Sequence, residues 1–213
     1  TSGLLAQPFW TKDAWAVIHA DPHAGNLFAT DDGRLAVLDW SLTARLSKAQ
    51  REAMVDAALG GLLLDAKKIC AAVAALGTLA PDDATLMDAA ARAVGRLRQG
   101  ALPGMKWLTD LLDDVAQRTD AGFRDDLVLF RKAWFTLETV IDDVLDSAAA
   151  VAHDPDDALV SVALQRFVAE LPARFAAPFG SRRFDSHVSN ADLFELWLSL
   201  GLVPTRYWWG RSG

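Results

Sequence analysis

Four polar residues near the N-terminus have types and spacings that suit phosphoryl transfer. His19 and Asp21 lie two residues apart, Asn26 lies five residues after Asp21, and Asp39 comes thirteen residues later. A phosphoryl-transfer site needs an acidic residue near the acceptor hydroxyl, together with an amide and a second carboxylate that hold Mg²⁺ against the phosphates. Since histidine occurs four times in the chain and asparagine only twice, chance is a poor explanation for this pattern.

The residues around this set predict how it is positioned. An apolar run over 14–18 leads into residues 19–26, which contain a proline and a glycine and are therefore expected to form a loop. Two apolar runs within 27–38 flank the turn-forming string Asp-Asp-Gly, which is typical of a β-hairpin. A loop followed by a hairpin would return the chain so that Asp39, at the end of the second strand, reaches the same metal as Asn26.

The rest of the chain is predicted to be helical. Alanine, the best helix former, supplies 38 of the 213 residues. One helix is expected to be central and buried, because seven apolar residues four and three apart form one of its faces: Phe123, Leu127, Phe130, Trp134, Leu137, Ile141 and Val144. Other helices are expected near residues 48–64, 66–77, 81–98, 105–118, 156–170 and 190–201. The expected N-caps are Ser47 and Asp65, and the expected core positions of the last two helices are Phe167, Leu171, Leu193, Trp197 and Leu200.

Composition narrows the classes of function. The formal net charge is −7 and the pI is near 5.0. A protein that coats nucleic acid normally carries a net positive charge, so no nucleic-acid partner is expected. The single cysteine, Cys70, excludes an internal disulfide framework and a multi-cysteine metal site. No apolar run approaches the roughly 18 to 20 residues that span a bilayer, and no signal peptide is found. We therefore expect a globular protein of the cytoplasm, with the periphery of a membrane as a second location.

Two strings resemble a known family. His19-Ala-Asp-Pro-His-Ala-Gly-Asn26, followed by Leu38-Asp39-Trp40-Ser41, resembles the UbiB (AarF-domain) family of atypical protein-kinase-like proteins, whose usual strings are HADPHPGN and DFG. Residues 130–138, with Asp154-Pro155 after that helix, resemble the C-terminal half of the same family. The resemblance implies a mainly α fold, namely a protein-kinase-like C-lobe with a small β-hairpin that carries the metal aspartate. It also implies ATP and Mg²⁺ as cofactors, an ATPase-like or kinase activity, and a link to ubiquinone biosynthesis or related lipid metabolism.

The resemblance also implies roles for individual residues. Asp21 corresponds to the catalytic aspartate, and His19 to a residue that braces the loop. Asn26 and Asp39 correspond to the metal ligands, through which the nucleotide is held. His23 is expected to lie on the phosphate side of the loop or to pack within it.

The part of the family that precedes these strings has no counterpart in the sequence. We find no KxGQ string, no alanine-rich nucleotide loop and no early lysine–glutamate pair. We therefore expect a single domain without an N-lobe, in which residues 1–45 carry the catalytic loop and the metal-site hairpin and residues 46–213 form the helical C-lobe. The expected partner is the missing N-lobe or an upstream domain, and an oligomer is a second way to cover the exposed lobe face. Alone, the chain is expected to be catalytically inactive.

Two departures from the family strings keep other functions open. Ala24 stands where the family has proline, and Trp40-Ser41 follows the metal aspartate in place of Phe-Gly. Asp-Trp at this point also occurs in aminoglycoside- and choline-kinase-like proteins, so a small-molecule phosphotransferase is the main alternative. A non-catalytic pseudokinase fragment that binds partners or lipids is the third hypothesis.

Three further patterns are less specific. His19 and His23 are four residues apart, as in a zinc pair, but the proline between them disfavours the helix that such a pair needs. Asp142, Asp143 and Asp146 match the DDxxD string of isoprenoid synthases, yet aspartate is so common here that a solvated helix face is favoured. Aromatic residues near the C-terminus are typical of contact with a membrane surface or lipid, or of packing back onto the domain: Trp197, Tyr207, Trp208 and Trp209.

Overall fold

The computed structural model describes residues 2–119, 122–148 and 155–199 of the chain. Their contacts divide the chain into two compact units. Unit 1 comprises Thr1–Lys48 and Asp125–Ala169, and unit 2 comprises Ala49–Arg124 and Glu170–Gly213. Helices make up most of the described residues and the described strands all lie in unit 1, so the mainly α fold class with a small hairpin is confirmed. The single domain expected from the sequence, with its loop segment ending at residue 45, stays a prediction.

The part of unit 1 that carries the candidate site contains a two-stranded antiparallel sheet. β1 (Trp15–His19) pairs with β4 (Thr43–Ser47), and His19 lies opposite Thr43. The side chains on one face of this sheet are buried: Ala16, Ile18, Ala44 and Leu46. The sequence does not predict β4, because its five residues include only two apolar ones, too few to show a period of two.

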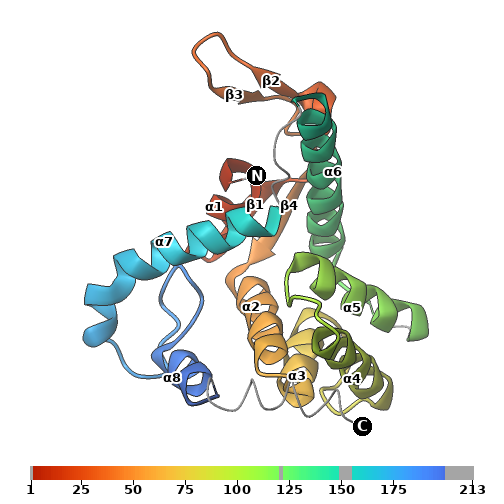
Figure 1. Ribbon diagram of the computed structural model, residues 1–213, viewed down its shortest axis with the longest axis vertical. Helices are drawn as coiled ribbons and strands as arrows, with labels where there is room; N and C mark the ends of the chain where they lie inside the picture. Colours follow the sequence, from red (N-terminus) through yellow and green to blue (C-terminus); the bar gives the residue numbers. More distant parts are fainter. Residues whose placement is uncertain (1, 120–121, 149–154, 200–213) are drawn as a thin grey trace. The chain divides into compact units, whose positions relative to one another are not determined.

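The hairpin predicted from the sequence is present, and Figure 1 shows it beyond the sheet. β2 (Leu27–Ala29) pairs antiparallel with β3 (Leu35–Val37). The turn between them contains Gly33 at φ 76°, a left-handed conformation that favours glycine. The Thr30 N–H donates to the Arg34 carbonyl at 2.9 Å and closes the turn.

The position of Asp39 relative to the hairpin corrects one expectation. The sequence places Asp39 at the end of the second strand, whereas β3 ends two residues earlier, at Val37. The strand ends there because the Leu38 carbonyl lies 3.0 Å from Nε2 of the His19 ring and bonds to it instead of to a neighbouring strand. Asp39 therefore belongs to the connection between β3 and β4.

α6 (Asp125–Ala148) packs along β4 and β1 and supplies much of the core of unit 1 (Figure 1). Four residues of the predicted stripe are buried: Leu127, Phe130, Trp134 and Leu137. The ring of Phe130 stacks on Phe9, with ring centroids 6.0 Å apart. Phe9 ends α1 (Gln7–Phe9), which follows the π-helical turn η1 (Ser2–Ala6). The prediction of a buried helix is confirmed for this part of the stripe.

The two ends of the predicted stripe are wrong. Phe123 precedes the helix, and the side chain of Val144 is 59% exposed. Length explains the second error. α6 has 24 residues and is about 36 Å long, whereas the strands packed against it have five residues and span about 17 Å. The strands therefore cannot cover the whole helix.

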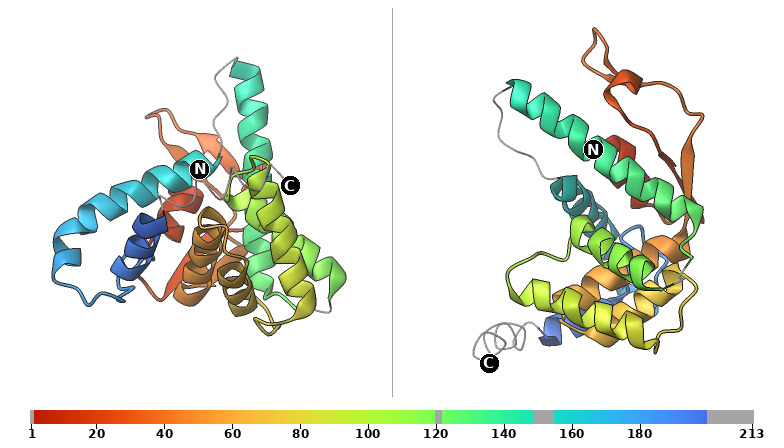
Figure 2. Two further views of the ribbon diagram at one scale, coloured as in Figure 1. Left: turned by 60° about the horizontal axis from the view of Figure 1, so that its bottom comes forward. Right: turned by 90° about the vertical axis from the view of Figure 1, so that its right-hand side faces the viewer.

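Five helices form most of unit 2, as the sequence predicts: α2 (Lys48–Leu62), α3 (Ala66–Leu76), α4 (Ala84–Arg98), α5 (Met105–Arg118) and α8 (Asn190–Ser199). α3 packs on α4 and α4 packs on α5, as Figure 2 shows. Asp65 caps α3 as expected, since its carboxylate accepts the N–H groups of Lys67 and Lys68. Asp83 caps α4 in the same way, so α4 begins at residue 84 and not at Pro81.

α7 (Pro155–Phe175) begins in unit 1 and ends in unit 2. The prediction of apolar core positions at the end of α7 and on α8 is wrong. Leu171 is 39% exposed, Trp197 is 65% exposed, Phe167 and Leu193 are partly exposed, and Leu200 lies outside the described residues. The buried side chains here are mostly polar instead: Arg174, Phe184, Ser186, His187, Ser189 and Asp192. Apolar spacing cannot predict a core held by hydrogen bonds. Within the described ranges, no helix is long and apolar enough to cross a membrane.

Candidate active site

His19, the last residue of β1, is 1% exposed and joins the loop to the hairpin. Its Nδ1 accepts the Asp21 N–H at 3.2 Å, and its Nε2 lies 3.0 Å from the Leu38 carbonyl oxygen. A backbone N–H can only donate and a carbonyl can only accept, so the hydrogen of the neutral ring must be on Nε2. Both ring nitrogens are therefore used by the backbone, which fits the loop-bracing role that the resemblance implies and leaves neither for zinc.

The loop itself is held by hydrogen bonds to the Asp21 carbonyl. This oxygen accepts the His23 N–H at 2.9 Å and Nδ2 of Asn26 at 3.1 Å. Residues Ala24–Asn26 form a 3-10 turn, η2, which His23 caps because its Nδ1 accepts the Gly25 N–H at 3.1 Å. A Cβ on Gly25 would lie 3.1 Å from the His23 ring, so the tight turn favours glycine. The loop residues that the sequence singles out therefore form one compact hydrogen-bonded turn.

Backbone hydrogen bonds also bring Asp39 toward this turn. The Leu38 N–H donates to the Asn26 carbonyl at 2.9 Å, while the Leu38 carbonyl bonds to His19. Asp39 follows directly, at φ 49°, a left-handed conformation that aspartate adopts more readily than most residues. Its exposed carboxylate accepts the Ser41 N–H at 3.2 Å, and hydrogen bonding from Ser41 lowers the pKa of Asp39. Asp39 is therefore ionised at neutral pH.

Asp21 has a basic partner that comes from a distant part of the sequence. Nζ of Lys132, on α6, lies 2.9 Å from Asp21 Oδ1, and Nε2 of His23 lies 3.8 Å from Oδ2. The hydrogen bond from Lys132 is the main reason why the pKa of Asp21 is lowered. The Asp21 side chain remains 33% exposed. An ionised, solvent-accessible carboxylate at this place could accept a hydrogen bond from an acceptor hydroxyl.

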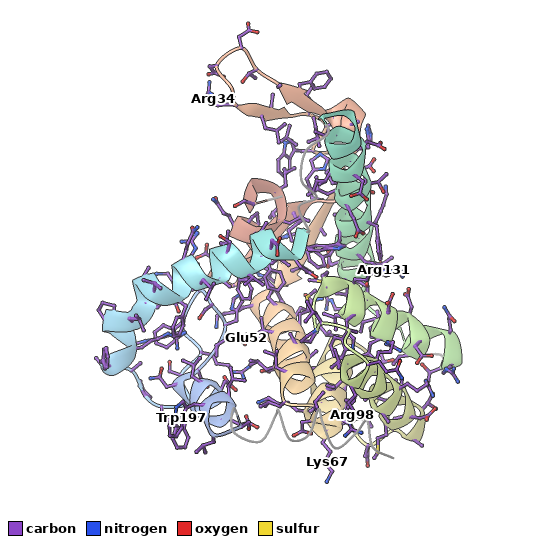
Figure 3. All side chains as sticks on the ribbon, in the orientation of Figure 1. Arg34, Glu52, Lys67, Arg98, Arg131 and Trp197 are labelled. Atoms are coloured by element: carbon purple, nitrogen blue, oxygen red, sulfur yellow. The ribbon has the colours of Figure 1, made fainter. Side chains whose placement is uncertain are left out.

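Trp40 lies against the buried histidine. Its ring meets the His19 ring edge to face, with centroids 5.0 Å apart, and its Nε1 donates to the Val37 carbonyl at 3.2 Å. The side chain is still 51% exposed. Trp40 thus contacts the His19 ring, and its bond to Val37 spans the backbone of Leu38 and Asp39. Arg34, labelled in Figure 3, marks the far end of the same hairpin.

The donor set of Asn26 and Asp39 fits Mg²⁺. Because Nδ2 of Asn26 donates to a carbonyl, the amide orientation is fixed and Oδ1 remains as an acceptor. Asp39 Oδ1 accepts from Ser41, and Oδ2 is the second oxygen of an exposed carboxylate. Mg²⁺ prefers oxygen ligands and is held by one or two protein groups, with phosphates and water completing the shell. Among the described residues, no group of three or more His, Cys, Asp or Glu side chains is placed to hold a metal.

The other sequence patterns show no metal-binding cluster in the part of the chain that the structure describes. Asp142 and Asp143 are exposed on α6, as expected for a solvated helix face, and the side chain of Asp146 lies outside the described residues. Trp197 is exposed on α8 and stacks on Phe194, with ring centroids 6.0 Å apart (Figure 3). The other aromatic residues of the predicted tail, 207–209, lie outside the described residues.

Lys132 is the functional candidate that sequence reasoning does not identify. It lies 111 residues after Asp21, and no spacing rule connects the two. One signal is available: Lys132 belongs to residues 130–138, the second stretch that resembles the family. Its neighbour Arg131 is directed elsewhere, with its guanidinium 5.5 Å from the centroid of the Phe135 ring.

Comparison with known proteins finds similarity in the part of the chain that carries the candidate site. The sequence profile described as the ABC1 atypical kinase-like domain matches residues 11–73, which include β1, the loop, the hairpin and β4. The Arabidopsis thaliana protein ACTIVITY OF BC1 COMPLEX KINASE 1, chloroplastic, is 35% identical over 68 residues, which are 32% of this chain and 10% of that protein.

Two uncharacterized proteins of Synechocystis are also similar. One is 45% identical over 50 residues, 24% of this chain and 12% of its own length, and the other is 39% identical over 64 residues, 30% of this chain and 11% of its own length. The chain thus spans about a tenth of the length of these relatives. No solved structure gives a significant match.

Proposed function

We propose that the chain contributes the acceptor-side carboxylate and the metal ligands of an ATP- and Mg²⁺-dependent kinase or ATPase. The match of residues 11–73 to the ABC1 atypical kinase-like domain supports this proposal. In this proposal Asp21 is the catalytic residue, Asn26 and Asp39 hold the metal, and His19 positions the loop. His23 caps the turn on the side of Asp21. An N-lobe or upstream domain would complete the nucleotide-binding site, and this is the partner that we propose.

The observation that carries the proposal is the backbone of Leu38. Its N–H bonds to Asn26 and its carbonyl bonds to His19, so one residue fixes the distance between the loop and the chain that carries Asp39. A hairpin joined to a loop in this way holds two candidate metal ligands without a direct bond between their side chains. Such preorganisation suits a site whose remaining ligands are phosphates.

The chemistry of each residue follows from its surroundings. Asp21, held as a carboxylate by Lys132, would accept a hydrogen bond from the hydroxyl of an acceptor or of water. It would take that proton as the oxygen bonds to the γ-phosphorus and the bond from this phosphorus to the departing nucleoside diphosphate breaks. Bound Mg²⁺ would neutralise charge on the phosphates. The acceptor class that the family resemblance suggests belongs to ubiquinone or related lipid metabolism, in the cytoplasm or at the periphery of a membrane.

Substitution of Asp39 tests the proposal. Asparagine keeps the shape and tolerates a positive φ, so the Asp39→Asn protein should fold normally while Mg²⁺-ATP affinity falls by about tenfold or more, the loss expected for one charged ligand. Affinity is measured by calorimetric titration of the natural full-length protein. Asp31→Asn, an equivalent change in the exposed hairpin turn, is the control and should bind like the wild type. Equal affinity of the Asp39→Asn and wild-type proteins would contradict the metal role.

A further inference from the structure

We propose that Lys132 is a phosphate-binding and positioning residue of this site: its ammonium group holds the Asp21 carboxylate and donates to the terminal phosphate of a bound nucleoside triphosphate. The inference rests on the proposed function and makes it more specific. It assigns a role to a residue of α6, outside residues 11–73 that match the family profile.

The first support is the geometry of α6. Phe130 and Trp134 are each 1% exposed, so this side of the helix is fixed in the core of unit 1. Asp126, at the start of the same helix, accepts the Arg45 N–H of β4 at 2.9 Å. Lys132 lies midway between Phe130 and Trp134 in sequence and is therefore on the opposite side of the helix, where its side chain is 49% exposed. The helix that presents Lys132 is thus anchored, while its ammonium group is open to solvent.

The second support is the balance of charge at the loop. Asp21 and Asp39 are both ionised at neutral pH, and a nucleoside triphosphate brings several more negative charges. One Mg²⁺ ion neutralises only part of this charge. A fixed cation beside Asp21 would reduce the repulsion between the carboxylate and the incoming phosphate.

The third support is the number of hydrogen bonds that the ammonium group of Lys132 can donate. It carries three N–H donors, and the contact with Asp21 Oδ1 at 2.9 Å uses one of them. An ion pair that is about half exposed contributes little to folding, so rearranging it on ligand binding costs little. Lys132 can therefore keep Asp21 in place and donate to a phosphate oxygen as well.

A purely structural role is the competing explanation. In that case the Lys132–Asp21 pair only ties the loop to α6, and its loss would affect every ligand of the loop equally. Terminal-phosphate binding differs, because it affects ATP and leaves ADP, which lacks that phosphate, nearly unchanged. The ratio of the two affinities therefore separates the explanations.

The experiment measures Mg²⁺-ATP and Mg²⁺-ADP affinities by calorimetric titration of the natural full-length protein. Lys132→Met should weaken Mg²⁺-ATP binding about tenfold and Mg²⁺-ADP binding by less than about threefold, the difference expected for one charge-assisted hydrogen bond. Lys132→Arg keeps the charge and should recover most of the lost ATP affinity. Lys106→Met is the matched control, since Lys106 is also paired with an aspartate on a helix surface, 3.7 Å from Asp110, and should change neither affinity.

The remaining outcomes distinguish failure of this inference from failure of the proposed function. Equal weakening of ATP and ADP binding by Lys132→Met, or no weakening at all, would overturn the phosphate-binding role of Lys132 while leaving the proposed function intact. A wild-type protein that binds neither nucleotide would overturn the proposed function, and this inference with it.

Discussion

Two aspartates of this protein, one in each unit, make similar ion pairs in different surroundings. Asp21 Oδ1 lies 2.9 Å from Nζ of Lys132, and Asp192 Oδ1 lies 2.9 Å from Nη2 of Arg182. The side chains of the first pair are 33% and 49% exposed, whereas Asp192 is 10% and Arg182 is 27% exposed. Equal distances therefore conceal different degrees of access to solvent.

The hydrogen bonds around the second pair explain its burial. Asp192 also accepts the N–H and the hydroxyl of Ser189, at 2.8 and 2.6 Å, and Arg182 makes two further bonds of 2.6 Å to Asp56. A buried charge is tolerated when its hydrogen-bonding capacity is filled in this way. The pair in unit 2 is thus suited to holding α8 against α2, while the pair in unit 1 keeps the solvent access that a reacting carboxylate needs.

The largest effect that this comparison predicts is on turnover. Asp21→Asn removes the carboxylate that would take the acceptor proton, so kcat should fall by about 10²–10⁴ while nucleotide affinity and stability change little. The assay is ATP turnover by the natural full-length protein with Mg²⁺. A variant that loses nucleotide binding but keeps the turnover of bound nucleotide would show that Asp21 holds the metal and that the roles of Asp21 and Asp39 must be exchanged.

The composition of the site explains how much of it could be predicted. Asp21, Asn26 and Asp39 lie within 19 residues, so a loop and a hairpin predicted from local sequence are enough to suggest that they share one site. That shared site stays a prediction, and the sequence does not predict the place of Asp39 after β3. His19 could be predicted as a bracing residue only through the resemblance. Lys132 could not be predicted, because its contact with Asp21 depends on how α6 packs against the strands.

The fold shows the same limit. Asp65 caps α3 through bonds to residues two and three positions later, so the start of α3 follows from the sequence. Asp83 caps α4 in the same way, but the preceding Pro81 is also typical of a helix start and predicts a start three residues too early. β4 needs its partner β1 to become a strand, and five residues carry too little pattern to show this alone. Nη2 of the buried Arg174 donates to Glu170, Ser186 and Val188, and a count of apolar positions cannot detect such a network.

A smaller effect, on stability, is predicted for Arg182. Arg182→Met leaves the carboxylates of Asp56 and Asp192 without this partner, and the free energy of unfolding should fall by about 2 kcal/mol, less than for a fully buried pair because the site is partly open. Urea unfolding of the natural full-length protein measures it. ATP turnover should stay unchanged at temperatures where the protein is folded.

Arg34→Met provides the matched control for Arg182. Arg34 lies 2.6 Å from Asp32 in the hairpin turn, but the two side chains are 82% and 54% exposed. An exposed pair of this kind contributes roughly 0.2–1 kcal/mol at most. Similar losses of stability for the Arg34 and Arg182 variants would mean that the additional hydrogen bonds around Arg182 do not make its ion pairs more stabilising than the exposed pair of Arg34.

The smallest predicted effect is a difference in acid sensitivity. Burial acts to raise the pKa of Asp192, but hydrogen bonds from Ser189 and the charge of Arg182 outweigh it, so the pKa of Asp192 is lowered. A carboxyl whose pKa is lower in the folded state contributes stability above its unfolded pKa of about 3.9 and loses this contribution as the pH falls toward the folded value. The free energy of unfolding should therefore fall from about pH 5 downward.

Asp192→Asn isolates this contribution. The variant should be less stable than the wild type at pH 7, and its stability should depend less on pH between about 5 and 3, because the amide does not titrate. Urea unfolding at several pH values gives both profiles, and Asp31→Asn, at an exposed turn position, should keep the wild-type slope. Parallel profiles for the wild-type and Asp192→Asn proteins would show that Ser189 and Arg182 do not favour the ionised form of Asp192. The Asp192–Arg182 pair would then stabilise unit 2 through packing, and it would differ from the Asp21–Lys132 pair only in its exposure to solvent.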